Sequence, residues 1–256
     1  MAEADPTRRF SHRAADYARA RPGYPPAVLA ELERSIGFEP AWIVADIGSG
    51  TGISTRMFLD AGCRVHAVEP NAAMRAEAER TLGAASHFHS VAGSASATGL
   101  EPSSVDLIVA AQALHWFDAR AVVPEFARIA RPNGRLCVLW NERRTAGSAF
   151  ASGYEDLLAR RGTDYGQVLA RNLTPERVAP YFAGAHFHHV TLPYSQALDL
   201  AGIQSRLLSS SYVPLAGEPG HEALLAELGE LFARNQRDGT VEIAYDSHVY
   251  CGALAR

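Results

Sequence analysis

The sequence has 256 residues, 47% of them hydrophobic, and a formal net charge of -4 at pH 7. This length and composition suffice for one large buried core with an appendage. The slight acidic excess argues against a nucleic-acid-binding surface, which normally needs clustered Lys and Arg. No apolar run approaches the roughly 18 residues of a membrane helix. We therefore expect neither a nucleic-acid nor a membrane partner.

Two further features indicate a cytoplasmic location. The first ten residues are polar and charged and lack the apolar stretch of a secretory signal peptide. Cys63, Cys137 and Cys251 are widely spaced and lie in apolar or strand-like stretches, which favours buried thiols in a reducing compartment.

Helical spacing begins near the N-terminus. Apolar residues predict a helix over 7–20, which ends in a proline-rich segment at 21–26. A second helix is predicted from Pro26 to Ile36. Residues 1–40 are thus expected to form an N-terminal helical cap.

From residue 42 the pattern alternates between short apolar runs and helical spacing. Strands are predicted at 42–47, 64–68, 86–91, 105–111 and 136–140. Helices are predicted at 51–61, 71–82 and 119–130, and a turn at Arg131–Gly134. Such alternation is typical of a parallel, doubly wound sheet. Its ligand crevice lies beyond the carboxyl ends of the first and fourth strands, where the strand order reverses.

The regular alternation of predicted strands and helices ends after residue 142. Helical segments are predicted over 150–183, interrupted by loops at Gly162 and Thr174-Pro175, and further helices at 198–210 and 221–234. Strands are predicted at 186–194 and 241–252. We interpret the chain as one domain over 1–256, with a cofactor-binding core at 41–142, a substrate cap at 143–240 and the final strand within 241–256.

The first predicted strand runs into Asp46-Ile47-Gly48-Ser49-Gly50-Thr51-Gly52. Glycines at a strand-to-helix turn let the backbone approach a ligand, and the helix start offers free N–H groups. A dinucleotide loop would need glycine where Ile53 stands, and a phosphate-binding P-loop would need a lysine. Glu69 ends the second strand, where an acid can accept both hydroxyls of a ribose.

The loop Asp46–Gly52 resembles the first motif of the class I S-adenosylmethionine-dependent methyltransferases. Val65–Pro70, Asp106–Phe117 and Arg131–Leu136 are similar to the second, fourth and fifth motifs. Phe10–Pro25 and Leu114–Phe117 look most like the type 11 group, which includes trans-aconitate methyltransferase-like proteins. The resemblance implies a Rossmann-like seven-stranded sheet whose last strand is antiparallel. A helical cap would be inserted after strand five and between the two final strands.

The resemblance also implies S-adenosylmethionine as cofactor, with S-adenosylhomocysteine as product. The expected contacts to its methionine and ribose parts are Asp46, Gly48, Ser49, Gly50, Thr51, Gly52 and Glu69. Pro70 and Met74 would flank the adenine, although Met74 could equally be a core residue. Ser94 and Ala95 occupy the place of an acid often found beside the adenine, where the backbone amide of Ala95 could substitute in part.

Two further pairs complete the implied cofactor site. Ala110 and Gln112, at the end of the fourth strand, would border the methionine amino group. Tyr17 and Arg21 would close over the cofactor, with Arg21 paired to its carboxylate. Arg21 could alternatively anchor the proline-rich segment.

The acceptor side is expected to include His115, Trp116, Trp140, Arg206 and Tyr212. His115 follows the fourth strand directly and is a candidate general base or a pocket wall. The two tryptophans suit aromatic walls around a sulfonium cation, or the core. Arg206 and Tyr212 belong to a polar run that would hold a small anionic substrate or form a simple loop.

No metal site is expected. His186, His188 and His189 form a histidine-rich segment on a predicted strand. The side chain of His189 points to the opposite face from the other two, so the three do not converge.

The leading hypothesis is methyl transfer to a small-molecule acceptor by in-line displacement, because a helical cap closes over a pocket and would obstruct a macromolecule. A protein or RNA methyltransferase and a non-catalytic cofactor-binding module are the alternatives. We expect a monomer or a homodimer.

Overall fold

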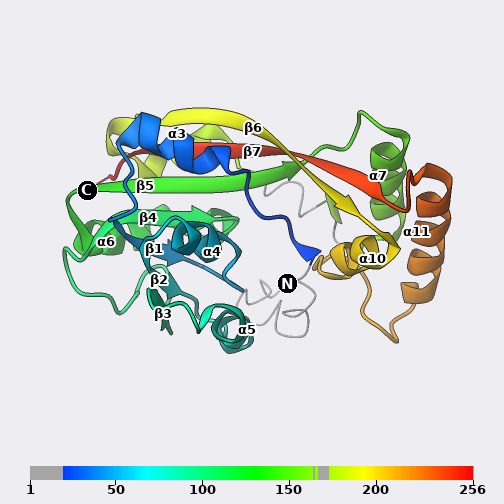
Figure 1. Cartoon of the computed structure of the whole chain (residues 1–256), viewed down its shortest axis with the longest axis horizontal. Coiled ribbons are helices and arrows are strands. Elements are labelled where there is room, and N and C mark those ends of the chain that lie inside the picture. The colour runs from blue at the N-terminus through cyan, green and yellow to red at the C-terminus, as the bar shows by residue number, and fades with distance from the viewer. Residues whose placement is uncertain (1–19, 164, 167–172, 256) are drawn as a thin grey trace.

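The computed structural model describes residues 20–163, 165–166 and 173–255. Within them, seven strands form one sheet in the order β3-β2-β1-β4-β5-β7-β6 (Figure 1). Six of these strands run in the same direction, and β7 runs in the opposite direction between β5 and β6. The predicted Rossmann-like doubly wound sheet with an antiparallel last strand is confirmed.

The parallel half of the sheet follows the sequence prediction closely. Its strands are β1 (Ile43–Ile47), β2 (Arg64–Val68), β3 (Phe88–Val91) and β4 (Val105–Ala111). Its helices are α3 (Ala27–Ile36), α4 (Ile53–Asp60), α5 (Ala72–Leu82) and α6 (Ala119–Ile129). The side chain of Asn71 caps α5 by accepting from the N–H groups of Ala73 and Met74, at 2.9 and 3.1 Å.

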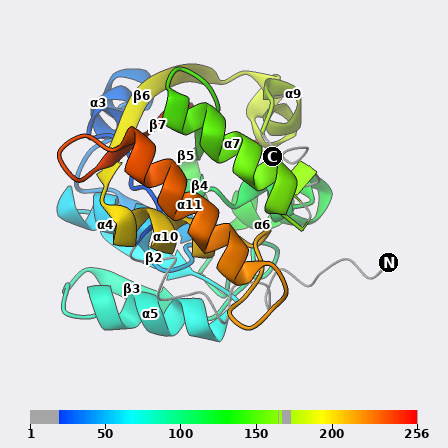
Figure 2. The ribbon, with the colours of Figure 1, turned by 90° about the vertical axis from the view of Figure 1, so that its right-hand side faces the viewer.

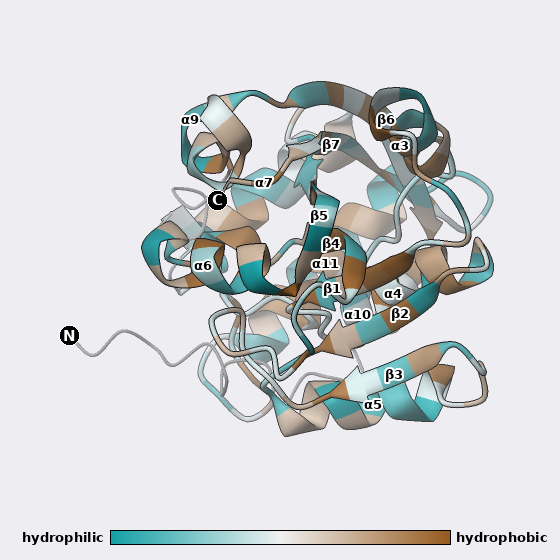
Figure 3. Ribbon diagram, turned by 90° about the vertical axis from the view of Figure 1, so that its left-hand side faces the viewer, coloured by the Kyte–Doolittle hydropathy of each residue, from teal (hydrophilic) through white to brown (hydrophobic). Residues whose placement is uncertain are grey.

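Strands β1 and β4 are buried along most of their length, as expected for inner strands of a parallel sheet covered on both faces. Separate apolar clusters cover the two faces: Ile108, Phe126 and Leu136 belong to one, and Leu32, Phe58 and Leu107 to the other. Figure 3 shows the hydrophobic colour concentrated on the inner strands and hydrophilic patches on α5 and α6.

Strand β5 (Ala130–Arg143) is longer than the predicted 136–140. The predicted turn at Arg131–Gly134 lies inside it, because pairing with β4 jumps from Val105–Ala130 to Leu107–Arg135. The turn residues therefore form an irregular insertion within the strand and do not end it. At its other end β5 continues beyond Leu139, the partner of the last β4 residue.

The extension of β5 carries a second structural unit. Strands β6 (His188–Leu198) and β7 (Val241–Ala253) run alongside β5, and α7 (Ala149–Arg161), α10 (Leu200–Leu208) and α11 (His221–Asn235) gather at their far end (Figures 1 and 2). This cap has its own apolar core, which includes Leu158, Leu207 and Leu228.

The prediction for the cap was only partly right. The helices expected at 198–210 and 221–234 are present as α10 and α11. In the range 150–183, α7 ends just before Gly162 and α9 (Pro175–Val178) begins after Thr174, at the two predicted breaks. After α9, the described residues form only two short 3₁₀ turns, η2 (Ala179–Tyr181) and η3 (Ala183–Ala185), where a longer helical segment was predicted. None of the described helices is both long enough and apolar enough to cross a membrane.

Candidate cofactor and acceptor site

A cavity of about 530 Å³ opens at the carboxyl ends of β1, β2, β4 and β5 and extends to the cap. Its walls include Gly48–Thr51, Glu69–Asn71, Ala111–Ala113 and Trp140–Arg143, the segments that end or follow these strands. This is the crevice that a reversal of strand order creates in an open α/β sheet. The volume falls within the range of small-molecule and cofactor sites.

The glycine loop has a left-handed backbone at all three glycines, with φ of 71° at Gly48, 57° at Gly50 and 85° at Gly52. Gly48 and Gly50 line the cavity. Gly52 does not; a Cβ there would lie 2.4 Å from Cδ1 of Leu82 on α5. Gly52 thus allows α4 and α5 to pack closely, and the expected direct contact with the cofactor is not supported by its placement.

Asp46 also lies beneath the cavity wall instead of in it. The residue is fully buried, and its Oδ2 accepts hydrogen bonds from Oγ of Ser54 at 2.7 Å and Oγ1 of Thr55 at 2.6 Å. Burial raises the pKa of its carboxyl from 3.8 to about 6. Asp46 therefore braces the first turn of α4 below the glycine loop.

Glu69 lines the cavity and holds the loop in place. Its Oε2 accepts from the N–H of Gly50 at 3.0 Å, and its Oε1 accepts from the N–H of Asn71 at 2.8 Å. The side chain is largely buried, which raises the pKa of its carboxyl. Each carboxylate oxygen can accept a second hydrogen bond, so Glu69 has the capacity to hold two ribose hydroxyls.

Two hydroxyls in the loop indicate that a polar ligand belongs here. Oγ of Ser49 and Oγ1 of Thr51 are buried, and neither has a hydrogen-bond partner among the described residues. Both residues line the cavity. Buried polar atoms are normally satisfied, so these two fit the amino-acid part of S-adenosylmethionine next to the acid that suits its ribose.

The residues predicted around the adenine lie together on one wall. Pro70, Met74, Ser94 and Ala95 all line the cavity. Ser94 and Ala97 form a tight turn through paired backbone hydrogen bonds. Met74 is largely buried on the inner face of α5 and also lines the cavity. Its position therefore fits both a contact with the adenine and a role in the core.

The end of β4 differs by one residue from the prediction. Ala110 is fully buried in the core, and Ala111 lines the cavity instead, because successive strand residues point to opposite faces. Gln112 lines the cavity with a left-handed φ of 56°, a conformation that costs on the order of 1–3 kcal/mol for a residue other than glycine. Its Nε2 donates to the carbonyl of Asn141 at 3.0 Å.

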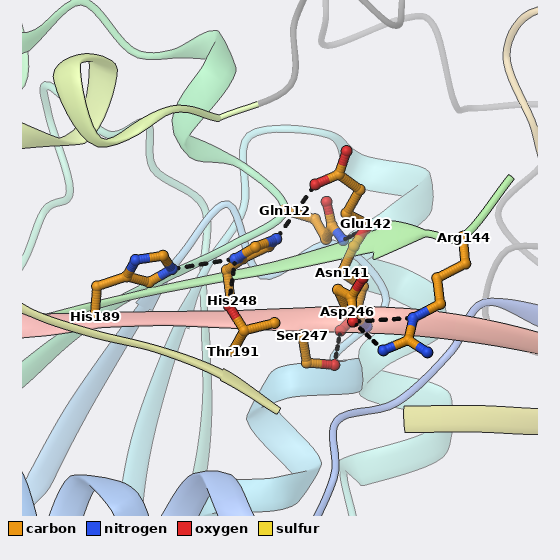
Figure 4. A network of polar contacts seen from close by, with 9 residues as sticks. All are labelled: Gln112, Asn141, Glu142, Arg144, His189, Thr191, Asp246, Ser247 and His248. Atoms are coloured by element: carbon orange, nitrogen blue, oxygen red, sulfur yellow. Dashed lines mark hydrogen bonds and ion pairs between the residues drawn. The ribbon is translucent and has the colours of Figure 1, made fainter. Parts of the chain in front are cut away.

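Asn141 ties three segments together beside the cavity. Its Nδ2 donates to the carbonyl of Gly23 at 2.9 Å, and its Oδ1 accepts from Oγ of Ser247 at 2.6 Å (Figure 4). Together with the bond from Gln112, these contacts connect the end of β4, the β5–β7 ladder and the segment before α3. The sequence analysis missed Asn141, because an asparagine at the end of a strand carries no specific motif.

An aromatic wall faces the middle of the cavity. His115 and Trp116 lie on the 3₁₀ turn η1 (Leu114–Trp116), and Trp140 lies on β5. The ring centroid of His115 is 4.6 Å from that of Trp116 and 5.2 Å from that of Trp140. All three line the cavity, so the structure brings together the residues predicted from two different strands.

The cap supplies the remaining wall. Arg206 and Tyr212 line the cavity as expected, together with Arg143, Tyr165 and Tyr245, which the sequence analysis missed. Arg143 donates to Glu155 at 2.5 Å and to the phenol of Tyr165 at 2.9 Å. Nothing in the spacing of these residues indicated that they would meet.

Arg21 reaches the cap from the N-terminal side. Its Nη2 donates to the carbonyl of Ser209 at 3.0 Å, and the residue lines the cavity. It therefore joins the segment before α3 to the end of α10. The predicted cofactor contact Tyr17 lies outside the described residues.

The histidine-rich segment has other partners. His188 pairs with Glu31 at 2.7 Å, whereas His189 stacks on Tyr250 and contacts His248 at 3.1 Å (Figure 4). Within the described part of the chain, no three His, Cys, Asp or Glu side chains are placed to hold a metal ion.

Comparisons with known proteins agree with this geometry. Residues 45–138 match the methyltransferase domain family. An uncharacterized methyltransferase of Mycobacterium tuberculosis is 36% identical over 138 residues, 52% of this chain and 52% of the relative. The chain thus matches about half the length of this relative. An uncharacterized methyltransferase-like protein of Schizosaccharomyces pombe is 27% identical over 98% of this chain and 97% of its own.

Solved structures share the fold. A provisionally assigned type II methyltransferase from Anaeromyxobacter dehalogenans has a TM-score of 0.66 and 24% identity, covering 92% of this chain and 99% of that protein. An S-adenosylmethionine-dependent methyltransferase from Thiobacillus denitrificans, solved with S-adenosyl-L-homocysteine, has a TM-score of 0.52 and 19% identity over 96% and 98%. A specific similarity to trans-aconitate methyltransferase-like proteins stays a prediction. Residues 45–138 are thus similar to methyltransferase domains, and the chain shares the fold of solved methyltransferases.

Proposed function

We propose that this chain transfers the methyl group of S-adenosylmethionine to a small-molecule acceptor by in-line displacement. One observation carries the proposal: a single cavity joins the glycine loop and Glu69 at one end to Arg206 and Tyr245 of the cap at the other. The first end suits the cofactor, and the second offers a place for an acceptor. A pocket of this volume accommodates small molecules.

The chain's own residues would provide binding and alignment. When bound, S-adenosylmethionine supplies a methyl group on a positively charged sulfur, so the cofactor contributes the intrinsic reactivity. Glu69 and the hydroxyls of Ser49 and Thr51 would fix its ribose and amino-acid parts. Fixed positions remove the entropic cost of bringing two reactants together.

The aromatic wall of His115, Trp116 and Trp140 would surround the atoms between which the methyl group moves. Trp116 and Trp140 flank His115 in the middle of the cavity. Aromatic faces stabilise a cation, and a wall of this kind keeps water from the reacting atoms. For an acceptor that carries a proton, we propose that a ring nitrogen of His115 removes it as a general base. An acceptor that is already ionised would need no base.

The test is an incubation of the purified protein with methyl-labelled S-adenosylmethionine and a host-cell extract, which is afterwards separated by molecular size. The proposal expects label in the small-molecule fraction. Label in protein or RNA would refute the small-molecule proposal and favour a macromolecular acceptor. If S-adenosylhomocysteine binds in calorimetry but extracts from several growth conditions yield no label, the chain is better described as a non-catalytic module. The Glu69→Gln variant is the matched negative control.

A further inference from the structure

We propose that the acceptor carries an oxyanion, a carboxylate or a phosphate, and that Arg206 binds it at the cap end of the cavity. This inference rests on the proposed function and specifies its substrate class. The oxyanion is a recognition group, distinct from the atom that accepts the methyl group.

The first support is a buried charge whose hydrogen-bond partners among the described residues are neutral. Arg206 on α10 is only 6% exposed and yet lines the cavity. Its Nε donates to the phenol oxygen of Tyr245 at 3.2 Å, and its Nη1 donates to Oγ of Ser210 at 3.3 Å. No ion pair joins Arg206 to a carboxylate of the described residues. A buried charge is unfavourable unless it is paired, and an anionic ligand would supply the missing partner.

The donors of Arg206 suit such a ligand. A guanidinium has five N–H donors in a planar fork that matches a carboxylate or phosphate, and the two protein bonds occupy only part of this set. Tyr245 and Tyr212 also line the cavity, and the phenol oxygen of Tyr245 lies within hydrogen-bond distance of the guanidinium. Hydrogen bonds to an ionised acceptor are roughly twice as strong as neutral ones.

The neighbouring charged residues do not neutralise the positive charge of Arg206. Of the two other arginines in the cavity wall, Arg143 is paired with Glu155 at 2.5 Å, and Arg21 bonds the carbonyl of Ser209 at 3.0 Å. Burial alone would raise the pKa of the Tyr212 phenol, but the nearby guanidiniums of Arg206 and Arg21 lower it. The cap end of the cavity is therefore positive.

Among the described residues, three acids also line the cavity, but each has another position or partner. Glu69 holds the glycine loop at the far end. Asp118 caps α6 by accepting from the N–H of Arg120 at 3.0 Å. Glu142 contacts Nε2 of His248 at 3.2 Å. None of these three acids pairs with Arg206, and the proposed oxyanion of the acceptor would supply such a partner.

The experiment measures anion preference directly, on protein saturated with S-adenosylhomocysteine. Titration calorimetry compares matched pairs of probes: benzoate with benzamide, succinate with succinamide, and phenyl phosphate with phenol. We expect at least one anion to bind 10-fold or more tightly than its neutral partner. The pair that shows the preference identifies carboxylate or phosphate as the recognised group.

The variant Arg206→Met should abolish this preference, and Arg206→Lys should restore part of it. Arg160→Met is the matched control, since Arg160 is exposed on α7 and pairs with Glu227 away from the cavity. Thermal melting establishes that each variant is folded, and S-adenosylhomocysteine affinity is measured separately.

Three results would overturn the inference. The first is that no anion binds better than its neutral partner, and the second is that the preference survives in Arg206→Met. A loss of S-adenosylhomocysteine affinity in Arg206→Met would instead assign this arginine to the cofactor. If the anion preference holds but the protein transfers no methyl group, the proposed function fails and the bound oxyanion is a ligand, not an acceptor.

Discussion

Replacing Asp46 by Asn should stabilise the protein near neutral pH and reduce its pH dependence. The carboxyl of Asp46 is fully buried, and burial raises its pKa from 3.8 to about 6. The folded state therefore holds the proton more tightly than the unfolded state does. Stability is highest while the group stays protonated and falls as the pH rises from about 4 through 6.

The size of this pH effect on stability follows from the pKa of Asp46 in the unfolded and in the folded state. Their difference corresponds to about 3 kcal/mol lost on full ionisation in the folded state. About 1.4 kcal/mol of this loss falls between pH 5 and pH 7.5. In the Asn variant the amide cannot ionise, and the hydroxyls of Ser54 and Thr55, which bond Asp46 in the wild type, can rotate to pair with it.

The assay is urea unfolding of both proteins at pH 5 and pH 7.5. The free energy of unfolding of the wild type, relative to the variant, should fall by roughly 1 kcal/mol between these two pH values. Asp156→Asn, an exposed substitution on α7, is the control for a general loss of negative charge. If the free energies of unfolding of the wild type and of Asp46→Asn differ by the same amount at both pH values, burial does not set the pKa of Asp46.

Three further predictions concern the loop and the aromatic wall. Glu69→Gln should weaken S-adenosylhomocysteine binding roughly 10- to 100-fold in calorimetry, because each bond to a charged acceptor contributes about 1.5–3 kcal/mol; unchanged affinity would remove Glu69 from the site. His115→Ala should lower kcat roughly 100-fold and abolish the acidic limb of the pH–rate profile; a rate retained across the pH range would exclude a base. Gly52→Ala should destabilise more than Gly99→Ala by about 1–3 kcal/mol in urea unfolding, since both have positive φ but only Gly52 would clash, with Leu82; equal losses would contradict the packing role.

The core could be predicted from the sequence because its signals are local. Strands such as β2 and β4 are short apolar runs with clear ends, and their observed bounds equal the predicted ones. The N-cap at Asn71 likewise depends on hydrogen bonds within three residues. The family motifs added the antiparallel last strand, which local spacing alone does not show.

The cap end of the cavity could not be predicted to the same depth. Arg143 and Tyr245 meet because β5 and β7 pair directly at these positions, a contact between residues 102 apart in sequence. The side of the strand on which Ala110 and Ala111 lie depends on register, and a shift of one residue reverses it. No short-range pattern encodes either feature.

The separate apolar core of the cap has a consequence for how such proteins diversify. The cap packs around Leu158, Leu207 and Leu228, whereas the glycine loop belongs to the sheet core of β1 and β4. Substitutions on α7, α10 or α11 can therefore reshape the acceptor wall while the glycine loop keeps its geometry. Under the proposed function, selection for a new acceptor needs no simultaneous change in the glycine loop, so the specificities for acceptor and cofactor can evolve independently.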